Sequence, residues 1–411
     1  MATAFFRTDG ELTCDGVSLA ELARDFGTPL YVYSWARIEE NFRRFDAAFA
    51  EVPHLVCYAT KANSSLAILR RLARLGAGAD VVSGGELRAA LECGIPAERI
   101  VFSGVGKTIE EIAAGVEAKI LAFNAESERE IEKIDAIARS KGSVASAALR
   151  VNPDIDARSH PYISTGLKQN KFGVEIGRAR EIFANARNLA NVRMTGIQAH
   201  IGSQILEAAP LAETAHELAA LAGELLSDGA PIESIDIGGG IGVGEGSLSP
   251  ESYAAAVLPY LRGLGYRILI EPGRAITGPA GVLLTRVLYL KSGREKNFII
   301  ADAGMNDFLR PALYQATHRI EPVANPRGRR LTTDVVGPVC ETSDFLLRDA
   351  EMDEPEESDL LAVRDAGAYG FAMSSNYNFR PRAAEVLVEA GRPVLIRRRE
   401  NFEDLTRTER V

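Results

Sequence analysis

Short apolar runs alternate with longer amphipathic segments between residues 55 and 274. This alternation is typical of parallel strands joined by crossover helices. Strands are predicted at residues 55–60, 77–82, 100–103, 120–124, 147–152, 194–202, 234–238 and 267–271, and helices at 66–75, 108–117, 126–140, 178–189, 211–226 and 253–264. Eight such units in series predict a closed (β/α)8 barrel of the TIM type.

The pattern changes after residue 274, where apolar runs follow one another without regular helices between them. Strands are predicted at residues 276–290, 298–302, 331–336, 359–363 and 393–397, and the acidic stretch 349–357 is expected to be a surface loop. The sequence therefore predicts an α/β chain with two domains. The barrel is expected over residues 28–278 and a β-rich domain over residues 1–27 and 279–411.

Polar residues stand where the predicted strands end, which is the face on which barrel enzymes build their active sites. The residues concerned are Lys61, Asp80, Ser83, Arg150, Asn152, His200, Ser203, Glu271 and Arg274. Any one of them is also explained as a helix cap or a solvated rim residue. Their convergence on one face of the barrel predicts a functional site.

Lys61 follows an apolar run directly, and this is a costly position for an ammonium group, which must be desolvated or chemically consumed there. A desolvated lysine amine condenses readily with an aldehyde such as that of pyridoxal phosphate, forming a Schiff base. The alternative is a lysine whose stem lies along the strand end while its ammonium reaches solvent.

Three adjacent glycines, Gly238, Gly239 and Gly240, end the seventh predicted strand. Glycines let the backbone approach a ligand closely, and a phosphate at the late strands of a barrel is a common use of such a turn. A glycine run also forms ordinary turns. Its spacing and late position disfavour a dinucleotide-binding fold.

Composition and charge narrow the classes of partner and compartment. The chain has 411 residues, of which 46% are apolar, and a net charge of −9, so nucleic acid is not an expected partner. The four cysteines, Cys14, Cys57, Cys93 and Cys340, lack zinc-like spacing, which favours free thiols in a reducing compartment and no metal site. No signal-like or membrane-length apolar segment occurs, so a cytoplasmic protein without membrane attachment is expected.

Nine short segments together resemble the pyridoxal-phosphate decarboxylases of the alanine-racemase-like barrel family (group IV decarboxylases), and within it the enzymes that act on diaminopimelate. The segments are residues 58–63, 160–166, 171–173, 200–203, 238–240, 271–274, 310–314, 337–341 and 367–370. They occur in the family's order along nearly the whole chain. Asn170 departs from the serine that is common in relatives, with no expected catalytic consequence.

The resemblance implies a bound pyridoxal phosphate. Lys61 would hold it covalently, His200 would stack on its ring, and Glu271 would hydrogen-bond the ring nitrogen. A carboxylate there keeps the ring protonated, so that the ring accepts the electrons left by departing carbon dioxide. The remaining implied cofactor contacts are Asp80, Ser203, Gly238, Gly239, Gly240, Pro272, Gly273, Arg274 and Tyr369. From the residues alone, the alternative for His200 is a satisfied core histidine, which its position at a strand end disfavours, and the alternative for Glu271 is a salt bridge to Arg274.

The resemblance further implies decarboxylation of meso-2,6-diaminopimelate to L-lysine, the last step of lysine biosynthesis by that route. Cys340 would donate the proton, although an unpaired cysteine is often only a small buried apolar residue. The implied substrate contacts are Arg274, Arg310, Tyr314, Glu341 and Tyr369. In relatives the Cys340–Glu341 loop serves the partner subunit, so a homodimer with shared active sites is expected.

Two other enzymatic activities and one non-catalytic function fit the same fold. A decarboxylase of ornithine, arginine or carboxynorspermidine would be expected to lack the 310–314 pattern beside Glu341. An alanine racemase would need no site for a second carboxylate. A non-catalytic barrel protein would not need Lys61, Glu271 and Cys340 together.

Overall fold

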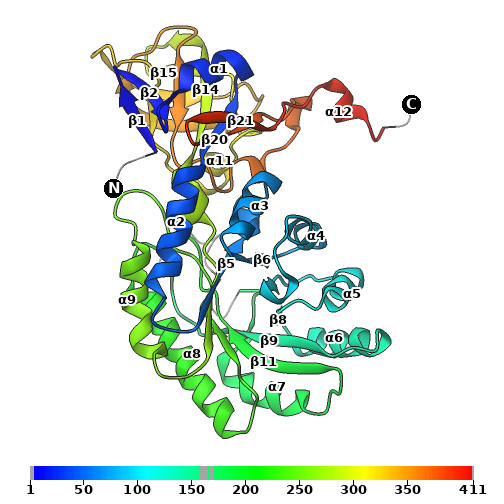
Figure 1. The fold of residues 1–411 in the computed structure, drawn as a ribbon. Coiled ribbons are helices and arrows are strands. Elements are labelled where there is room, and N and C mark those ends of the chain that lie inside the picture. The colour runs from blue at the N-terminus through cyan, green and yellow to red at the C-terminus, as the bar shows by residue number, and fades with distance from the viewer. Residues whose placement is uncertain (1–3, 158–164, 167–169, 410–411) are drawn as a thin grey trace. The chain divides into compact units, whose positions relative to one another are not determined.

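The computed structural model describes residues 4–157, 165–166 and 170–409. The chain divides into two compact units, one formed by Met1–Glu40 with Ile276–Val411 and the other by Asn41–Ala275. Helix α2 (Trp35–Ala48), labelled in Figure 1, carries the chain from the first unit to the second, and the short helix α10 (Arg274–Thr277) carries it back. None of the described helices combines the length and hydropathy needed to cross a bilayer.

The unit Asn41–Ala275 is a closed parallel barrel, which confirms the predicted fold and all eight predicted strands. The strands are β5 (His54–Ala59), β6 (Gly78–Val81), β7 (Ile100–Phe102), β8 (Ala122–Ala125), β9 (Ala145–Asn152), β11 (Val192–Gln198), β12 (Ser234–Asp236) and β13 (Arg267–Ile270). Each pairs in parallel with the next, β13 pairs with β5, and the β8–β9 pairing completes the ring. The strands are buried on both faces, and this explains why they read as continuous apolar runs.

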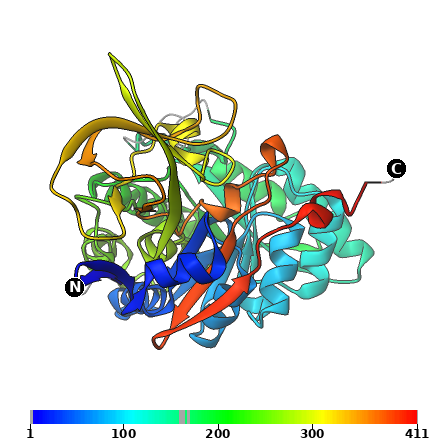
Figure 2. The same ribbon diagram turned by 90° about the horizontal axis from the view of Figure 1, so that it is seen from above.

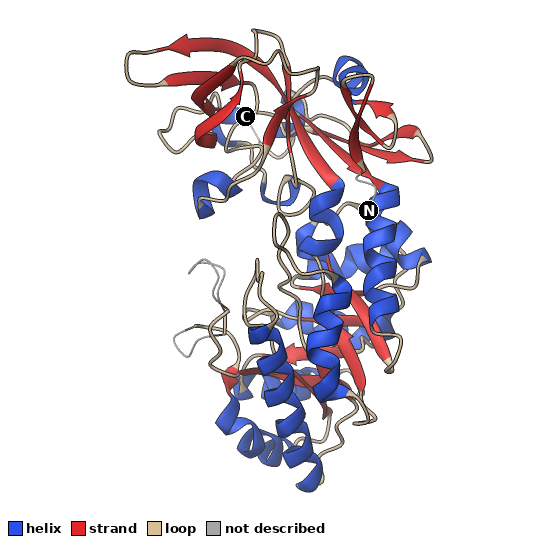
Figure 3. Ribbon diagram, turned by 90° about the vertical axis from the view of Figure 1, so that its left-hand side faces the viewer, coloured by secondary structure: helices blue, strands red, loops and turns tan. Residues whose placement is uncertain are grey.

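Helices surround the barrel strands, as Figure 3 shows in blue around red. They are α3 (Leu66–Arg74), α4 (Gly84–Glu92), α5 (Ile109–Ala118), α6 (Glu128–Ser140), α7 (Ala179–Ala186), α8 (Ala209–Ser227) and α9 (Pro250–Leu261). Several begin at a capping side chain, because the first N–H groups of a helix need acceptors. Ser83, which the sequence placed at a polar strand end, accepts a hydrogen bond from the backbone of Glu86 and caps α4.

The other unit is β-rich. Its largest sheet has the order β18-β17-β15-β14-β4-β20-β21, and β14 and β15 form a long antiparallel hairpin that Figure 2 shows clearly. These strands are β4 (Leu30–Ser34), β14 (Gly281–Ser292), β15 (Asn297–Ala301), β17 (Arg330–Val336), β18 (Phe345–Asp353), β20 (Ala384–Glu389) and β21 (Arg392–Arg397). Two further strands, β16 (Ile320–Pro322) and β19 (Leu360–Val363), pair with each other and join at β14.

One prediction in this unit is wrong. The acidic stretch 349–357 was expected to be a loop, but its first part lies in β18, which pairs antiparallel with β17. Met352 is buried while its acidic neighbours in the strand, Glu351 and Asp353, are more exposed, so the strand keeps one apolar contact within a charged sequence. The prediction failed because the many acidic residues of this stretch outweighed the single apolar position that faces the core.

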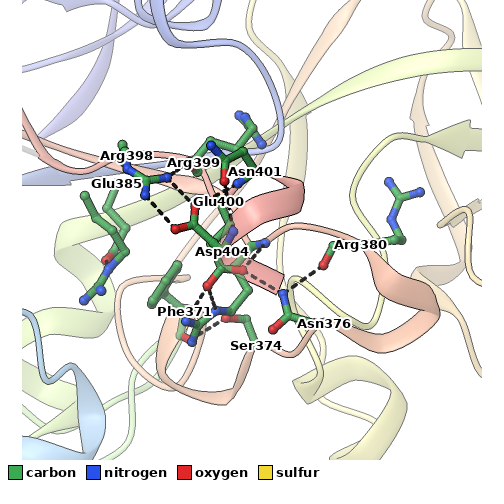
Figure 4. A network of polar contacts seen from close by, with 12 residues as sticks. Phe371, Ser374, Asn376, Arg380, Glu385, Arg398, Arg399, Glu400, Asn401 and Asp404 are labelled. Carbon is green, nitrogen blue, oxygen red and sulfur yellow. Dashed lines mark hydrogen bonds and ion pairs between the residues drawn. The ribbon is translucent and has the colours of Figure 1, made fainter. Parts of the chain in front are cut away.

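An apolar core fills the β-rich unit. It combines the N-terminal hairpin of β1 (Phe5–Thr8) and β2 (Glu11–Cys14), helix α1 (Leu19–Phe26) and strands β4, β14 and β20. The C-terminal segment is bound by polar contacts (Figure 4). Glu400 accepts hydrogen bonds from the Arg382 guanidinium at 2.6 and 2.8 Å and from Asn376 at 2.7 Å. The segment after β21 is thereby attached to the loop before β20.

Candidate active site

Lys61 and Asp80 form an ion pair at the ends of β5 and β6. The Lys61 Nζ atom lies 2.7 Å from Asp80 Oδ2, and the lysine side chain keeps 32% of its surface exposed while the aspartate side chain is fully buried. The other carboxylate oxygen, Asp80 Oδ1, is buried and has no hydrogen-bond donor among the described residues. The lysine amine is therefore held at the rim of the barrel by a buried carboxylate, rather than extended alone into solvent.

His200 follows β11 and is held from two sides. Its Nδ1 atom accepts a hydrogen bond from the Gly239 N–H at 3.2 Å, and its backbone oxygen accepts from Thr165 Oγ1 at 2.6 Å. Burial, together with the positive charges of Lys61 and Arg150, lowers the pKa of His200 well below its ordinary value. A neutral imidazole of fixed tautomer is a flat, uncharged surface suited to stack on an aromatic ring.

Glu271 follows β13 and is 4% exposed. One of its carboxyl oxygens accepts from the Asn124 amide at 3.3 Å and the other from the Gln198 amide at 3.4 Å. Burial, and then the negative charges of Asp236 and Asp80, raise the pKa of Glu271 well above its ordinary value. The group is thus a buried carboxyl that retains its proton more readily than a solvated one.

The glycines after β12 lie where no side chain fits. A Cβ atom at Gly239 would stand 2.1 Å from the Glu271 backbone oxygen, and one at Gly240 would stand 2.4 Å from that of Gly202. Gly238 and Gly240 also have φ angles of 65° and 102°, in the left-handed region. The N–H groups of Gly238 and Gly239 donate to Asp236 and His200 respectively, so these two N–H groups organise the site itself.

Arg274 and Ser203 approach each other from α10 and the loop after β11. The Arg274 Nη2 atom donates to Ser203 Oγ at 2.9 Å, and Arg274 is 7% exposed. Gly273 precedes the arginine, and a Cβ there would stand 2.9 Å from that of Ala62, beside Lys61. A guanidinium, a hydroxyl and a bare backbone form a donor set that fits a phosphate.

The other predicted site residues belong to the β-rich unit. Arg310, in α11 (Arg310–Tyr314), is 5% exposed; its Nε donates to His318 Nε2 at 3.3 Å and its guanidinium lies 5.7 Å from the Tyr314 ring centre. Tyr369 has a φ of 54°, a position that a residue other than glycine seldom takes.

Cys340 and Glu341 lie in the loop between β17 and β18. Cys340 is exposed, and its backbone N–H donates to Asn378 Oδ1 at 3.3 Å. Hydrogen bonds from the Tyr377 hydroxyl and from Ser343 lower the pKa of Glu341. An exposed thiol beside a carboxylate does not fit the alternative of a small buried apolar residue. The resembling segment 160–166 lies largely outside the described residues.

Several buried polar contacts around the barrel strands were not identified from the sequence, which named Arg150 but not its partner. Asn124 and Gln198 hold Glu271, while Arg150 pairs with buried Glu126 at 2.6 Å. Lys107, whose side chain is 1% exposed, donates to Glu130 at 2.6 Å. The sequence feature that could have revealed these contacts is a polar residue in or just after each of several apolar strands. The parallel register, in which Gln198 stands beside Asp236, brings such residues together.

The residues present fit pyridoxal phosphate. An amine held at 2.7 Å from Asp80 suits the aldehyde, the buried Glu271 carboxyl suits the ring nitrogen, and Ser203 with Arg274 suits the phosphate. The family model for the pyridoxal-binding domain of pyridoxal-dependent decarboxylases matches residues 35–278. This match and the barrel site identify the chain as a pyridoxal-dependent decarboxylase.

Similarity to known proteins extends over nearly the whole chain. The chain is 49% identical to a diaminopimelate decarboxylase of Aquifex aeolicus over 96% of this chain and 94% of that protein, and 48% identical to one of Vibrio cholerae over 99% and 98%. The structure of the Helicobacter pylori diaminopimelate decarboxylase complexed with L-lysine superposes with a TM-score of 0.92 at 45% identity, covering 95% of this chain and 98% of that one. The chain belongs to the diaminopimelate decarboxylase family.

Proposed function

We propose that this chain decarboxylates meso-2,6-diaminopimelate to L-lysine, as the last step of lysine biosynthesis by the diaminopimelate route in the cytoplasm. The observation that carries the proposal is the Lys61 amine held at 2.7 Å by buried Asp80, within a chain 45–49% identical over most of its length to the diaminopimelate decarboxylases compared above. The L-lysine in the Helicobacter pylori complex supports this choice of product.

Pyridoxal phosphate, when bound, supplies an aromatic ring that accepts the electron pair left as carbon dioxide departs. Lys61 holds the cofactor through its amine, and Asp80 orients that amine. Neutral His200 would lie against the ring, and Glu271 would hold a proton at the ring nitrogen. The phosphate would be held by Ser203, Gly240, the backbone around Gly273 and Arg274, and the Tyr369 hydroxyl. Gly238 and Gly239 would give it room, since their own N–H groups donate to Asp236 and His200, and Pro272 would line the cofactor site.

Substrate choice depends on the groups that meet the distal end of the amino acid. Arg274, Arg310 and Tyr314 bind its second carboxylate, Glu341 binds its second ammonium, and Tyr369 completes the site. Charge-assisted hydrogen bonds contribute about 1.5–3 kcal/mol each, so two arginines favour the dicarboxylate over ornithine or lysine by roughly 10²–10⁴-fold.

The substrate assignment is tested by supplying the purified chain and pyridoxal phosphate with meso-diaminopimelate, L-ornithine or L-lysine separately. Carbon dioxide release is expected from meso-diaminopimelate in strong preference. Only this substrate has a second carboxylate, which Arg310 can bind while the first one is lost. Preferential release from ornithine or lysine would overturn the substrate while leaving the class of enzyme in place.

The proton that replaces carbon dioxide comes from Cys340, and the active chain is a homodimer in which Cys340 and Glu341 serve the partner subunit's barrel. The exposed position of Cys340 supports this role, since a proton donor must reach the reacting carbon.

Shared active sites predict complementation between two inactive variants. Coexpressed Lys61→Ala and Cys340→Ala subunits should recover part of the wild-type activity, because a mixed dimer contains one site with both groups intact. Lys61→Ala with Glu271→Gln is the matched control and should recover none, since each barrel then carries a defect of its own. The rate of carbon dioxide release is measured for the purified mixed dimers of each pair. Equal rates for the two pairs would contradict the shared site.

A further inference from the structure

Three buried carboxyl groups, those of Asp80, Asp236 and Glu271, lie near the Lys61 amine. Asp80, Asp236 and Glu271 are 0%, 1% and 4% exposed. The cation is Lys61, and it is bonded to Asp80. Asp236 and Glu271 are therefore two buried acids without a cation bonded to either among the described residues, and such groups are costly to ionise together.

Asp236 and Glu271 point to the same side of neighbouring strands. Asp236 stands in register with Leu269, two residues before Glu271, and side chains two apart along a strand share a face. The Glu271 N–H donates to the Gly238 oxygen at 2.8 Å, which fixes the two strand ends together. Asp236 Oδ1 accepts from the Gly238 N–H at 2.8 Å, whereas Asp236 Oδ2 is buried with no donor among the described residues.

The groups around the pair favour retention of a proton. Burial raises the pKa of Asp236 to about 6 although Gly238 donates to it, and burial with the charge of Asp236 raises that of Glu271. The titratable and polar groups that face the pair are Lys61, Asp80, Cys57, Tyr253, Asn124 and Gln198. Cys57 and Tyr253 are held neutral by burial, so Lys61 is the cation of this set.

We propose that Asp236 is a positioning residue that shares one proton with Glu271, so that Glu271 is protonated at neutral pH before the cofactor binds and presents this proton to the ring nitrogen. On binding, the O–H bond of Glu271 breaks, an N–H bond forms at the ring, and Glu271 remains as the carboxylate that accepts from it. The number of protons in the site is unchanged. The delivery of the proton to the ring rests on the proposed function. The sharing of the proton between Asp236 and Glu271 does not depend on the cofactor.

Infrared spectroscopy of the full chain without cofactor tests the shared proton. A protonated-carboxyl band is expected at neutral pH, and it should lose most of its intensity in Asp236→Asn and in Glu271→Gln, because the remaining acid no longer feels the negative charge of its partner and only Asp80 is left beside it. Asparagine keeps the oxygen that accepts from Gly238 and can donate to Glu271, so the fold is retained. Labelling aspartate carboxyls with ¹³C separates Asp236 from Glu271.

Asp135→Asn is the matched control. Asp135 is also buried, at 2% exposure, but it has a cation bonded to it: it accepts from Arg139 at 2.8 Å and from the Asn191 N–H at 2.6 Å, and it has no second carboxyl group with which to share a proton. The band should persist in this variant. Absence of the band from the wild-type chain, or its persistence in Asp236→Asn, would overturn the proposal.

A second measurement concerns cofactor binding and does not use turnover. Calorimetry of pyridoxal phosphate binding in two buffers of different ionisation enthalpy gives the protons taken up. Asp236→Asn should take up about one more proton per site than the wild-type chain, since its Glu271 begins ionised. Equal uptake would overturn the proton's delivery to the ring. Failure of the cofactor to bind Lys61 would instead refute the proposed function and leave the infrared result standing.

Discussion

Replacing Lys61 with alanine should lower the rate of carbon dioxide release by about 10³-fold or more, because the reacting amine is lost. Borohydride treatment of the cofactor-loaded wild-type chain should leave a pyridoxyl group on the Lys61 peptide, and the variant should carry none. Mass spectrometry of the digested chains measures this directly. Absence of the modified peptide from the wild-type chain would refute the role of Lys61.

Two comparisons distinguish the reactivity of the Lys61 amine from its positive charge. Lys61→Arg keeps a cation beside Asp80 but lacks a nucleophilic amine, so it should lose activity while retaining more stability than Lys61→Ala. Lys107 is a control within the same molecule: it also follows a barrel strand, but it is buried and donates to Gly104, Asn124 and Glu130. Its peptide should remain unmodified, because position after a strand is not enough to make a lysine reactive.

The contrast between these two lysines shows what sequence reasoning could predict. The eight barrel strands were predictable because each is a short apolar run between helical segments. Lys61 was notable for the apolar run before it, yet the sequence could not show that Asp80 would hold it, since that contact joins adjacent strands. Lys107 stands in the loop after β7 rather than directly after its strand, and only the structure shows that Glu130 occupies its amine.

The polar interior shows the same limit from the opposite direction. Asn124 and Gln198 lie in segments correctly predicted as strands, where a lone amide in an apolar run gives no indication of its partner. The closed register turns both amides toward Glu271, which is 147 residues from one and 73 from the other along the chain. Local pattern determines an element, whereas the identity of a buried partner depends on how distant elements pair.

Replacing Glu271 with glutamine should slow turnover by roughly 10²–10³-fold, the usual scale for one preorganised electrostatic group. A neutral amide cannot hold a proton at the ring nitrogen as a carboxylate does. The measurement is the single-turnover rate of decarboxylation with saturating cofactor, and Glu271→Asp should recover part of the lost rate because it restores the charge. A rate for Glu271→Gln close to that of the wild type would exclude the contact with the ring nitrogen.

The same variant should be more stable than the wild-type chain when both lack cofactor. A carboxyl whose pKa is raised on folding binds its proton more tightly in the folded state, so folding stability falls as pH rises above the unfolded value of about 4.5. Glutamine has no proton to lose, and this loss of stability should be absent. Gln198 has a buried carbonyl oxygen without a donor among the described residues, and this oxygen could accept from the new amide.

Glu126→Gln, the same substitution at another buried glutamate of the barrel, should have the opposite effect. Glu126 accepts from Arg150 at 2.6 Å and from the Gly173 N–H at 2.6 Å, so its removal leaves a buried guanidinium without its anion. Breaking such a pair costs about 3–5 kcal/mol. Chemical denaturation of both variants across the neutral range therefore distinguishes a carboxyl kept for chemistry from one that stabilises the barrel, and destabilisation by both would show that Glu271 is structural.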